Sequence, residues 1–590
     1  MKLSPSAHVD SFCRDRLPPV DQWPRLVFDL PELHYPDRLN AATTLLDETA
    51  ARLGPDRPCL RSPHETWTYG EVLARANRIA HVLTAELGVV PGNRVLLRGT
   101  NTPWLAACWL GVLKAGAVAV TTMPMLRRGE LDKITDRARP TVALCEERLL
   151  GELPPGLPVV PYRTASDTTA SDTTGPDTTG PDTTGPDTTG PDTTASSATE
   201  PGTTAPDTTA PDITAPDTTL PGSTGPSTLA ERCARHPATF ADVPTAADDV
   251  ALLAFTSGTT GTPKATMHFH RDLLAIADTF SRHVVRPTPD DIFCGTPPLA
   301  FTFGLGGLLV FPLRAGASVL LVDRATPKEL ASIVAEHGVT VLFTAPTAYR
   351  AILAAGDGPL LAGVRRAVSA GEALPAAVAE RYREVVGSPL IDGIGSTEML
   401  HVFISAAGDD ARPGRTGKVV PGFRAAVLDL DGRPVPDGTP GLLAVQGPTG
   451  CRYLDDPRQA DYVRGGWNIT GDTYVREPDG YFRFVARSDD MIVSSGYNIA
   501  APEVEEVLLT HPDVEECAVV GTPDPDRGAV VTAFVVLRPG VAPGPDVVHA
   551  LQEHAKAVAA PYKYPRRVRF LDALPRNASG KLQRYLLRER

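Results

Sequence analysis

The sequence predicts an α/β protein in which a large N-terminal domain with parallel and mixed sheets precedes a small α+β domain. Three observations indicate this organisation. The chain has 590 residues, more than one typical hydrophobic core accommodates. Strand patterns alternate with helix patterns on both sides of a low-complexity tract, an order that favours parallel sheets. Residues 489–590 follow a different order, in which two strands come directly after one another.

The alternation begins in residues 1–163. "YGEVLARANRIAHVLTAEL" (69–87) repeats apolar residues at helical spacing, which predicts an amphipathic helix. "NRVLLRG" (93–99) then predicts a strand, "WLAACWLGVLKAG" (104–116) a buried helix ended by Gly116, and "AVAVTTM" (117–123) a second strand. A strand, a helix and a strand in this order predict a parallel pair.

A repetitive tract follows, from Thr164 to Thr228. It consists almost wholly of Thr, Asp, Pro, Gly, Ala and Ser, and "DTTGP" recurs in register from Asp172. Too few apolar residues are present to offset the entropy of ordering, so we expect a disordered acidic insertion in the N-terminal domain. A tolerated loop expansion is the simpler interpretation. A glycosylated or partner-binding tract is the alternative.

The strand–helix order resumes after the tract. "VALLAF" (250–255) predicts a buried strand. "ASVLLVD" (317–323), a helix near 328–337 and "VTVLFTA" (339–345) repeat the earlier order. The uncharged segment 296–313 approaches the length of a membrane span. It holds three prolines and three glycines, so we expect a buried segment or a pocket wall instead.

The small domain is predicted over residues 489–590. "APEVEEVLLTH" (501–511) reads as a helix with Pro502 near its start. "VEECAVVG" (514–521) and "GAVVTAFVVL" (528–537) predict strands, followed by a helix near 547–558 and the stretch "RVRFLDALPR" (567–576). We place the domain boundary at Asp489, which leaves residues 1–488 to the N-terminal domain.

Charge and cysteine content restrict the function classes. The formal net charge of −13 and the pI of about 5.5 argue against nucleic acid as a partner. The eight cysteines form no CxxC pair or Cys/His cluster, which predicts reduced thiols in a cytoplasmic protein. The N-terminus has no apolar signal region, and no membrane partner is expected. A homo-oligomer is left open.

The stretch "TSGTTGTPK" (256–264) predicts a phosphate-binding loop directly after the strand at 250–255. Its two glycines allow backbone N–H groups to converge on an anion. The hydroxyls add short donors, and Lys264 adds a positive charge. Pro263 before this lysine and Ala265 after it do not fit the Walker pattern. An ordinary polar surface loop is the alternative.

Four further stretches carry polar residues suited to a nucleotide. "DGIGSTEM" (392–399) reads as a Gly-rich turn, and Glu398 in this turn, beside a phosphate site, would require a cation, which indicates Mg²⁺. In "WNITGDTY" (467–474), Asp472 after a tight turn suits the two hydroxyls of a ribose. "ARSDDMIVSSGYNI" (486–499) offers Arg487, and "PRNASGK" (575–581) offers Lys581. Each alone fits an ordinary salt bridge or turn, whereas their joint order is specific.

These motifs, in this order, resemble those of the acyl-adenylate-forming (AMP-binding) superfamily, which includes acyl- and aryl-CoA ligases, peptide-synthetase adenylation domains and luciferases. The resemblance covers nearly all of the chain outside 164–228. Four stretches are similar to the aryl-CoA ligase branch that acts on benzoate and, more closely, 2-aminobenzoate. They are "HVDSFCRDRLPPVDQWP" (8–24), "PPLAFTFGLGGLLVFPLRAG" (297–316), "SAGEALP" (369–375) and "DGIGSTEMLHVF" (392–403).

The resemblance implies a two-step ligase of aromatic compound metabolism. A carboxylate attacks MgATP to give an acyl-adenylate and pyrophosphate, and the CoA thiol then displaces AMP. The implied catalytic residues are Thr397 as a donor to the α-phosphate, Glu398 as the Mg²⁺ ligand, and Lys581 between the carboxylate and the α-phosphate. Beside Thr397 and Lys581, the implied nucleotide-binding residues are Thr256, Ser257, Gly258, Thr259, Thr260, Gly261, Lys264, Gly371, Glu372, Asp392, Ile394, Asp472 and Arg487.

The resemblance also implies an acyl pocket and a mobile small domain. The pocket residues are Thr302, Phe303, Gly304, Ala370 and His401. A ring could stack on Phe303, with close approach allowed by Gly304 and Gly306. His401 could bond a ring substituent such as an ortho-amino group, or be a satisfied core histidine. The implied hinge is Asp489, and Ser494, Gly496 and Tyr497 would line the CoA channel after the small domain rotates.

Alternatives to this function remain at the level of sequence. The acid could be another aryl or a medium-chain acid, or the acceptor could be a carrier protein instead of CoA. A protein of another class, a non-catalytic scaffold acting through the repeat tract, would not need Lys581 or Glu398, yet the chain has both.

Overall fold

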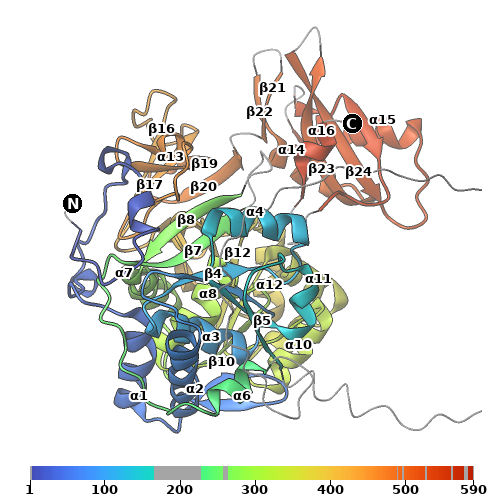
Figure 1. The fold of residues 1–590 in the computed structure, drawn as a ribbon. Coiled ribbons are helices and arrows are strands. Elements are labelled where there is room, and N and C mark those ends of the chain that lie inside the picture. The colour runs from blue at the N-terminus through green and yellow to red at the C-terminus, as the bar shows by residue number, and fades with distance from the viewer. Residues whose placement is uncertain are drawn as a thin grey trace, which may run out of the picture.

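The computed structural model describes residues 3–164, 227–256, 263–487, 490–494, 497–524, 528–559, 563–576 and 582–588. Figure 1 shows a large body of sheets and helices, with a smaller C-terminal unit beside the strands β19 and β20. The predicted mixed α/β architecture is confirmed. The predicted repeat tract lies outside the described residues except for its ends, and so do Asp489 and the residue before it.

A six-stranded sheet forms the first layer, in the order β6-β5-β3-β4-β7-β8. Its inner strands are parallel, and β8 pairs antiparallel with β7 at the edge. The predicted order of strand, helix and parallel strand is confirmed. The strands are β3 (Arg94–Arg98), β4 (Val118–Thr122), β5 (Val142–Glu146), β6 (Val159–Tyr162), β7 (Val250–Thr256) and β8 (Lys264–Phe269).

A nine-stranded sheet forms the second layer, in the order β15-β14-β13-β12-β11-β9-β10-β1-β2. Six of these strands, from β13 to β1, run parallel to one another, whereas β14 and β2 pair antiparallel at either side. The strands are β1 (Pro58–Arg61), β2 (Thr66–Thr68), β9 (Ile292–Gly295), β10 (Ser318–Leu320), β11 (Val341–Thr344), β12 (Arg366–Ala370), β13 (Ile391–Gly395), β14 (Val402–Ser405) and β15 (Lys418–Val419).

Helices cover these two sheets. The predicted amphipathic helix is α2, and Thr68 and Glu71 form a capping box at its start. Within the uncharged segment 296–313, residues 302–313 fold into short helical turns, and all of them except Phe303 are buried. The helices of the body are α1 (Glu48–Leu53), α2 (Tyr69–His81), α3 (Pro103–Lys114), α4 (Arg128–Ala138), α6 (Leu229–Cys233), α7 (His270–Ile276), α8 (Thr302–Leu305), the π-helical η8 (Gly306–Val310), α9 (Phe311–Ala315), α10 (Pro327–Glu336), α11 (Pro346–Ala355), α12 (Ala376–Val386) and α13 (Gln459–Tyr462).

Two further groups of strands complete the chain. An antiparallel sheet contains β16 (Arg424–Leu428), β17 (Gly441–Gln446), β18 (Val463–Arg464), β19 (Trp467–Arg476) and β20 (Phe482–Arg487). The C-terminal unit contains the hairpin β21 (Met491–Ser494) and β22 (Tyr497–Ala500), the sheet β23 (Val514–Asp524), β24 (Gly528–Leu537) and β25 (Arg567–Phe570), and the helices α14 (Ala501–Leu509), α15 (Pro545–Val558) and α16 (Arg584–Arg588). Its apolar side chains form clusters of their own, as expected for a separate α+β unit.

The chain is anchored where it enters and leaves the repeat tract. Thr164, two residues after the edge strand β6, is buried. Thr228 caps α6 by accepting a hydrogen bond from the Glu231 N–H. Beyond α6, the Asn77 side chain donates to the Ala238 carbonyl at 2.7 Å. The ends of the tract therefore belong to the packed body whatever the tract itself does.

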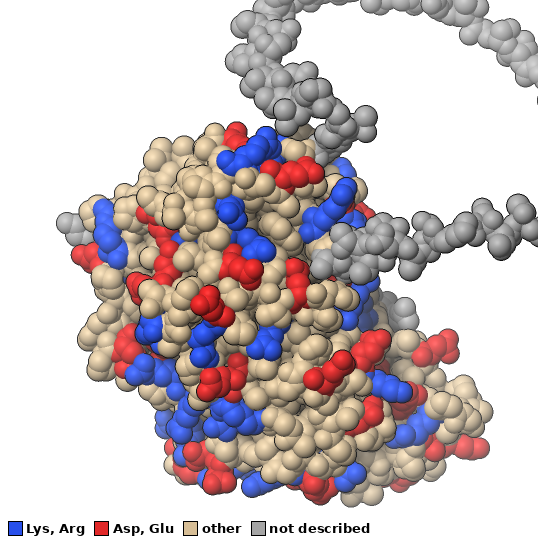
Figure 2. Space-filling view, turned by 90° about the horizontal axis from the view of Figure 1, so that it is seen from below, with Lys and Arg blue, Asp and Glu red and all other residues tan. Residues whose placement is uncertain are grey.

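Three surface and chemical properties bear on function. On the face drawn in Figure 2, acidic and basic side chains are interspersed, without a large field of one sign. No helix in the described part of the chain combines the length and hydrophobicity that a membrane crossing requires. All eight cysteines are buried free thiols, and burial raises their pKa, to about 12 for Cys13, Cys145, Cys233 and Cys294.

Candidate active site

The predicted phosphate loop joins β7 to β8 at the edge of the six-stranded sheet. Thr256 ends β7 and pairs with Lys264, the first residue of β8. Ser257, Gly258, Thr259, Thr260 and Gly261 lie outside the described residues. The two strands thus fix both ends of the loop, and Lys264 is held by a strand and not by the loop itself.

Lys264, Glu398 and Tyr453 form a hydrogen-bonded cluster next to this loop. The Tyr453 hydroxyl donates to Glu398 Oε1 at 2.6 Å, and Lys264 Nζ lies 2.9 Å from the same hydroxyl and 3.5 Å from Oε1. Burial and the neighbouring Glu398 raise the pKa of Tyr453, so the phenol stays a neutral donor. Both partners contact the same carboxylate oxygen. The Glu398 carboxylate is thereby fixed in place and mostly buried. Carboxylate oxygens are the ligands that Mg²⁺ takes together with substrate phosphates.

Thr397 and Glu398 lie in a turn between β13 and β14. The sequence predicted that 392–399 is all turn, but 391–395 form β13 and only the residues after it turn. Ser396 Oγ accepts from the Met399 N–H at 3.2 Å and contacts the Tyr462 hydroxyl at 3.2 Å. Leu400 has a φ of 68°, a region that residues with side chains seldom occupy. The turn therefore depends on its surroundings to keep its shape.

Asp472 and Arg487 face each other across the strands β19 and β20. Arg487 Nη1 donates to Asp472 Oδ1 at 3.1 Å. The sequence predicted a tight turn before Asp472, and this is wrong, because the residue lies inside the continuous strand β19. The strand register shifts here, and Gly471 has a φ of 79°. A bulge of this kind re-aims the next side chain, which is the effect that the predicted turn would have had.

Four of the predicted nucleotide-binding residues lie near the carboxyl ends of the neighbouring parallel strands β12 and β13. Asp392 on β13 is paired in register with Ser369 on β12, and β12 ends at Ala370. Gly371 follows with a φ of 91° and precedes Glu372. Ile394 lies two residues after Asp392 on the same strand. Burial raises the pKa of Asp392 to about 8, against a hydrogen bond from the Gly393 N–H. Ligands bind at this edge of open α/β sheets.

His401 is enclosed by aromatic rings at the predicted acyl pocket. Its side chain is buried, with the Phe311 ring edge-on at 4.6 Å, the Phe280 ring stacked at 5.4 Å and the Phe303 ring at 5.6 Å. Burial lowers its pKa to about 3, so the imidazole is neutral. Nε2 lies 3.4 Å from the Phe303 carbonyl, while Nδ1 has no hydrogen-bond partner among the described residues.

The glycines of this segment serve the chain itself. A Cβ at Gly304 would lie 2.1 Å from the Pro298 carbonyl oxygen, and one at Gly306 would lie 2.3 Å from the His401 ring. The sequence attributed both glycines to close approach of a substrate ring. In the structure, Gly304 allows close packing against the backbone, and Gly306 makes room for the His401 ring. Thr302 and Phe303 lie in the same helical turn as Gly304, α8.

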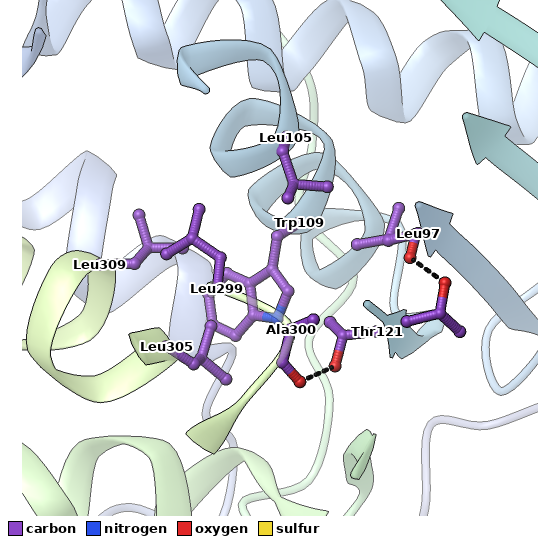
Figure 3. A pocket seen from close by; sticks show the side chains of 9 residues that line it. Leu97, Leu105, Trp109, Thr121, Leu299, Ala300, Leu305 and Leu309 are labelled. Carbon is purple, nitrogen blue, oxygen red and sulfur yellow. Dashed lines mark hydrogen bonds between the residues drawn. The ribbon is translucent and has the colours of Figure 1, made fainter. Parts of the chain in front are cut away.

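A small apolar cavity lies beside α8 and η8. Figure 3 shows Trp109 and Leu105 from α3 facing Leu305 and Leu309 across it. Its free volume is about 10 Å³, enough for roughly one water molecule. Neither Phe303 nor His401 lines it. It is therefore too small for an aromatic acid and is distinct from the predicted pocket.

The predicted CoA and hinge residues fall in the C-terminal unit. Ser494 is buried at the end of β21 and is paired with Tyr497, the first residue of β22. Asp489, Gly496 and Lys581 lie outside the described residues. The sequence missed three contacts of the site altogether: Tyr453, Tyr462 and His268, whose Nε2 lies 2.8 Å from the Thr397 carbonyl. No local motif marks them, since the fold alone brings them to the turn.

Two protein-family models match the chain. The model described as AMP-binding enzyme matches residues 46–452, and the AMP-binding enzyme C-terminal domain matches residues 503–581. The benzoate–CoA ligase of Thauera aromatica is 32% identical over 567 residues, which cover 95% of this chain and 97% of that relative. The 3-hydroxybenzoate–CoA ligase of an Aromatoleum species is 30% identical and covers 93% of this chain and 97% of its own.

Solved structures give the same relationship. An anthranilate CoA ligase in complex with anthranoyl-AMP has a TM-score of 0.79 at 29% identity, covering 95% of this chain and 98% of its own. A benzoate CoA ligase from Burkholderia xenovorans has a TM-score of 0.76 at 28% identity, covering 93% of this chain and 100% of its own.

Proposed function

The chain belongs to the AMP-binding enzyme family, and from this membership and its aryl-CoA ligase relatives we infer that it is an ATP-dependent aryl-CoA ligase. ATP and CoA are its substrates, and an aromatic carboxylic acid is the third. The non-catalytic scaffold is not favoured. The cytoplasmic location, the oligomeric state and the boundary at Asp489 stay predictions.

The first step needs charge stabilisation more than proton transfer. The attacking carboxylate is already ionised at neutral pH, so no general base is required. We propose that Lys264 and the loop at 256–262 bind the β- and γ-phosphates, and that Asp472 accepts the ribose hydroxyls. Thr397 would donate to the α-phosphate from its turn. Positioning and charge stabilisation of this kind account for most of the catalysis of phosphoryl-group chemistry.

Glu398 is the residue that we propose as the Mg²⁺ ligand. Tyr453 donates to Oε1 and Lys264 approaches the same oxygen, which orients the carboxylate before the nucleotide arrives. When bound, Mg²⁺ would neutralise charge on the phosphates. Lys264 would have a second effect, because it can leave Glu398 for a phosphate oxygen while Tyr453 continues to hold the carboxylate.

The choice of acid rests on one observation, the unpartnered Nδ1 of His401. The neutral ring has one N–H, and the Phe303 carbonyl beside Nε2 can only accept, so Nδ1 carries a lone pair. A buried acceptor without a partner costs about 1–3 kcal/mol. An ortho-amino or hydroxyl group on the substrate ring would supply the missing donor, whereas plain benzoate would not. We therefore propose 2-aminobenzoate over benzoate.

A panel of acids tests this assignment. Acid-dependent pyrophosphate release from MgATP is measured with 2-aminobenzoate, hydroxybenzoates, benzoate and hexanoate. We expect kcat/KM for 2-aminobenzoate to be at least ~10-fold above that for benzoate. Adding CoA should give the thioester and accelerate turnover. Equal rates for benzoate and 2-aminobenzoate would reject the substrate assignment. An adenylate that forms and ignores CoA would favour a carrier protein as the acceptor.

His401→Phe tests whether the histidine sets this preference. Phe preserves the aromatic packing and removes the acceptor, so we expect the 2-aminobenzoate-to-benzoate ratio of kcat/KM to fall from ~10 to ~1. His337→Phe, at the end of α10, is the matched control and should leave the ratio unchanged. An unchanged ratio in His401→Phe would make this residue an ordinary core histidine.

Replacing residues 165–226 by a short Gly/Ser linker should leave ligase activity within about twofold and the midpoint of thermal unfolding nearly unchanged. Both flanks pack on the body independently of the tract, and loop-closure entropy depends only weakly on length. The control is a Gly/Ser linker of the native length. Activity lost in both variants would show that the tract sequence contributes to catalysis, contrary to this expectation.

A further inference from the structure

The turn that carries Thr397 and Glu398 is supported at two points by one face of β8. Side chains two residues apart along a strand point to the same side, so Lys264, Thr266 and His268 share a face. Lys264 contacts the Glu398 carboxylate at 3.5 Å. His268 Nε2 contacts the Thr397 carbonyl at 2.8 Å. The edge strand β8 thus holds the turn at two points: Lys264 contacts the side chain of Glu398, and His268 contacts the backbone carbonyl of Thr397.

His268 is confined by burial and by its neighbours. It is fully buried, and its Nδ1, which has no hydrogen-bond partner among the described residues, lies 3.8 Å from Asp272 in the first turn of α7. Asp272 accepts from the Phe269 N–H at 3.0 Å and forms a fully buried ion pair with Arg452. Burial alone would raise the pKa of Asp272, but Arg452 and His268 outweigh it and lower this pKa. The imidazole therefore packs against a fixed carboxylate on one side and a carbonyl on the other.

The Thr397 carbonyl can only accept, so Nε2 is the donor in this bond. The bond acts on the backbone of the turn, which lies three residues before the left-handed Leu400. Such a conformation persists only where neighbours hold it. The hydroxyl of Thr397 and the carboxylate of Glu398 extend from the same turn, so their aim depends on this backbone.

We propose that His268 is a positioning residue for the adenylation step, which fixes the Thr397 backbone through Nε2–H and so directs the Thr397 hydroxyl and the Glu398 carboxylate at the nucleotide. This rests on the proposed roles of those two residues. His268 touches neither substrate nor reacting atoms. Its contribution is the geometry of the turn, with Asp272 and Arg452 as its support.

The test compares three variants in acid-dependent pyrophosphate release. His268→Leu removes the donor at similar volume and should lower kcat by at least ~20-fold with KM for ATP within about threefold, because small displacements of catalytic groups are costly. His268→Gln places an amide N–H near the Nε2 position and should recover kcat to within about threefold of wild type. Thr266→Val, on the same face of β8, is the matched control and should keep wild-type kcat.

A double-mutant cycle separates positioning from general destabilisation. In a Thr397→Ala background, His268→Leu should cost clearly less than in the wild-type background, about fivefold, because the hydroxyl that it positions is gone and only the aim of Glu398 is still affected. A loss of the same size in both backgrounds, or no loss in His268→Leu alone, overturns the proposal. If His268→Leu does not fold, His268→Asn takes its place, since its amide is too short to reach the carbonyl. Wild-type protein without acid-dependent activity would instead reject the proposed function.

Discussion

Lys581→Ala is expected to slow acyl-adenylate formation by about a thousandfold, the size of effect seen when a group that stabilises transition-state charge is removed. Negative charge concentrates between the attacking carboxylate and the α-phosphate, and the proposed place of Lys581 is there. Thioester formation from supplied acyl-adenylate should stay within about fivefold of wild type, because that step involves no attack on the α-phosphate of ATP. Measuring the two half-reactions separately checks this.

The chain offers a matched control in the same unit. Lys556 on α15 is exposed and pairs with Glu553 at 2.7 Å, so Lys556→Ala removes the same charge without approaching the site. It should leave both half-reactions unchanged. If Lys581→Ala slowed both half-reactions equally, the lysine would stabilise the unit as a whole and the assignment to adenylation would be wrong.

Glu398→Gln is expected to lower the adenylation rate by about 100-fold and to raise the Mg²⁺ concentration needed for half-maximal rate. The amide keeps the shape of the side chain and can still accept from Tyr453, but it lacks the negative charge. Pyrophosphate release measured across a Mg²⁺ titration checks both parts. Wild-type Mg²⁺ dependence in Glu398→Gln would remove this residue from the metal site.

Tyr453→Phe separates the charge of Glu398 from its orientation. The variant keeps the carboxylate and removes the hydroxyl that donates to Oε1 at 2.6 Å. We expect a smaller loss, about 10-fold, with the Mg²⁺ requirement shifted in the same direction. A Tyr453→Phe variant as slow as Glu398→Gln would mean that the hydroxyl acts on the substrate directly.

Local pattern was sufficient for the regular elements. Periodicity predicts the helix from Tyr69 to His81, because this helix buries one face in the core. A continuous apolar run predicts the strand from Arg94 to Arg98, because every residue of this strand is buried. The antiparallel sheet of β16 to β20 was not predicted, although its pairings join segments that are close together in the chain. The turn predicted before Asp472 was wrong because a glycine at positive φ marks a bulge as readily as a turn.

The candidate site shows the same division. Glu398 and Asp472 stand in recognisable stretches, and their placement could be expected from the order of those stretches. Tyr453 and His268 could not, because only tertiary packing brings β8 and the loop segment of Tyr453 near the turn. His401 lies between the two cases: sequence indicated its neighbourhood, but its shell of phenyl rings and its unpartnered Nδ1 are visible only in three dimensions.

The burial of all eight thiols has a consequence for an enzyme that handles a thiol substrate. CoA is a nucleophile and, once oxidised, a disulfide partner, and protein thiolates exchange with such partners in proportion to their access and ionisation. Here every cysteine is buried, with its pKa raised by that burial. Acyl groups activated at the site therefore have no competing sulfur on the enzyme. The folded protein should resist self-acylation and mixed disulfides with CoA for as long as its core stays closed.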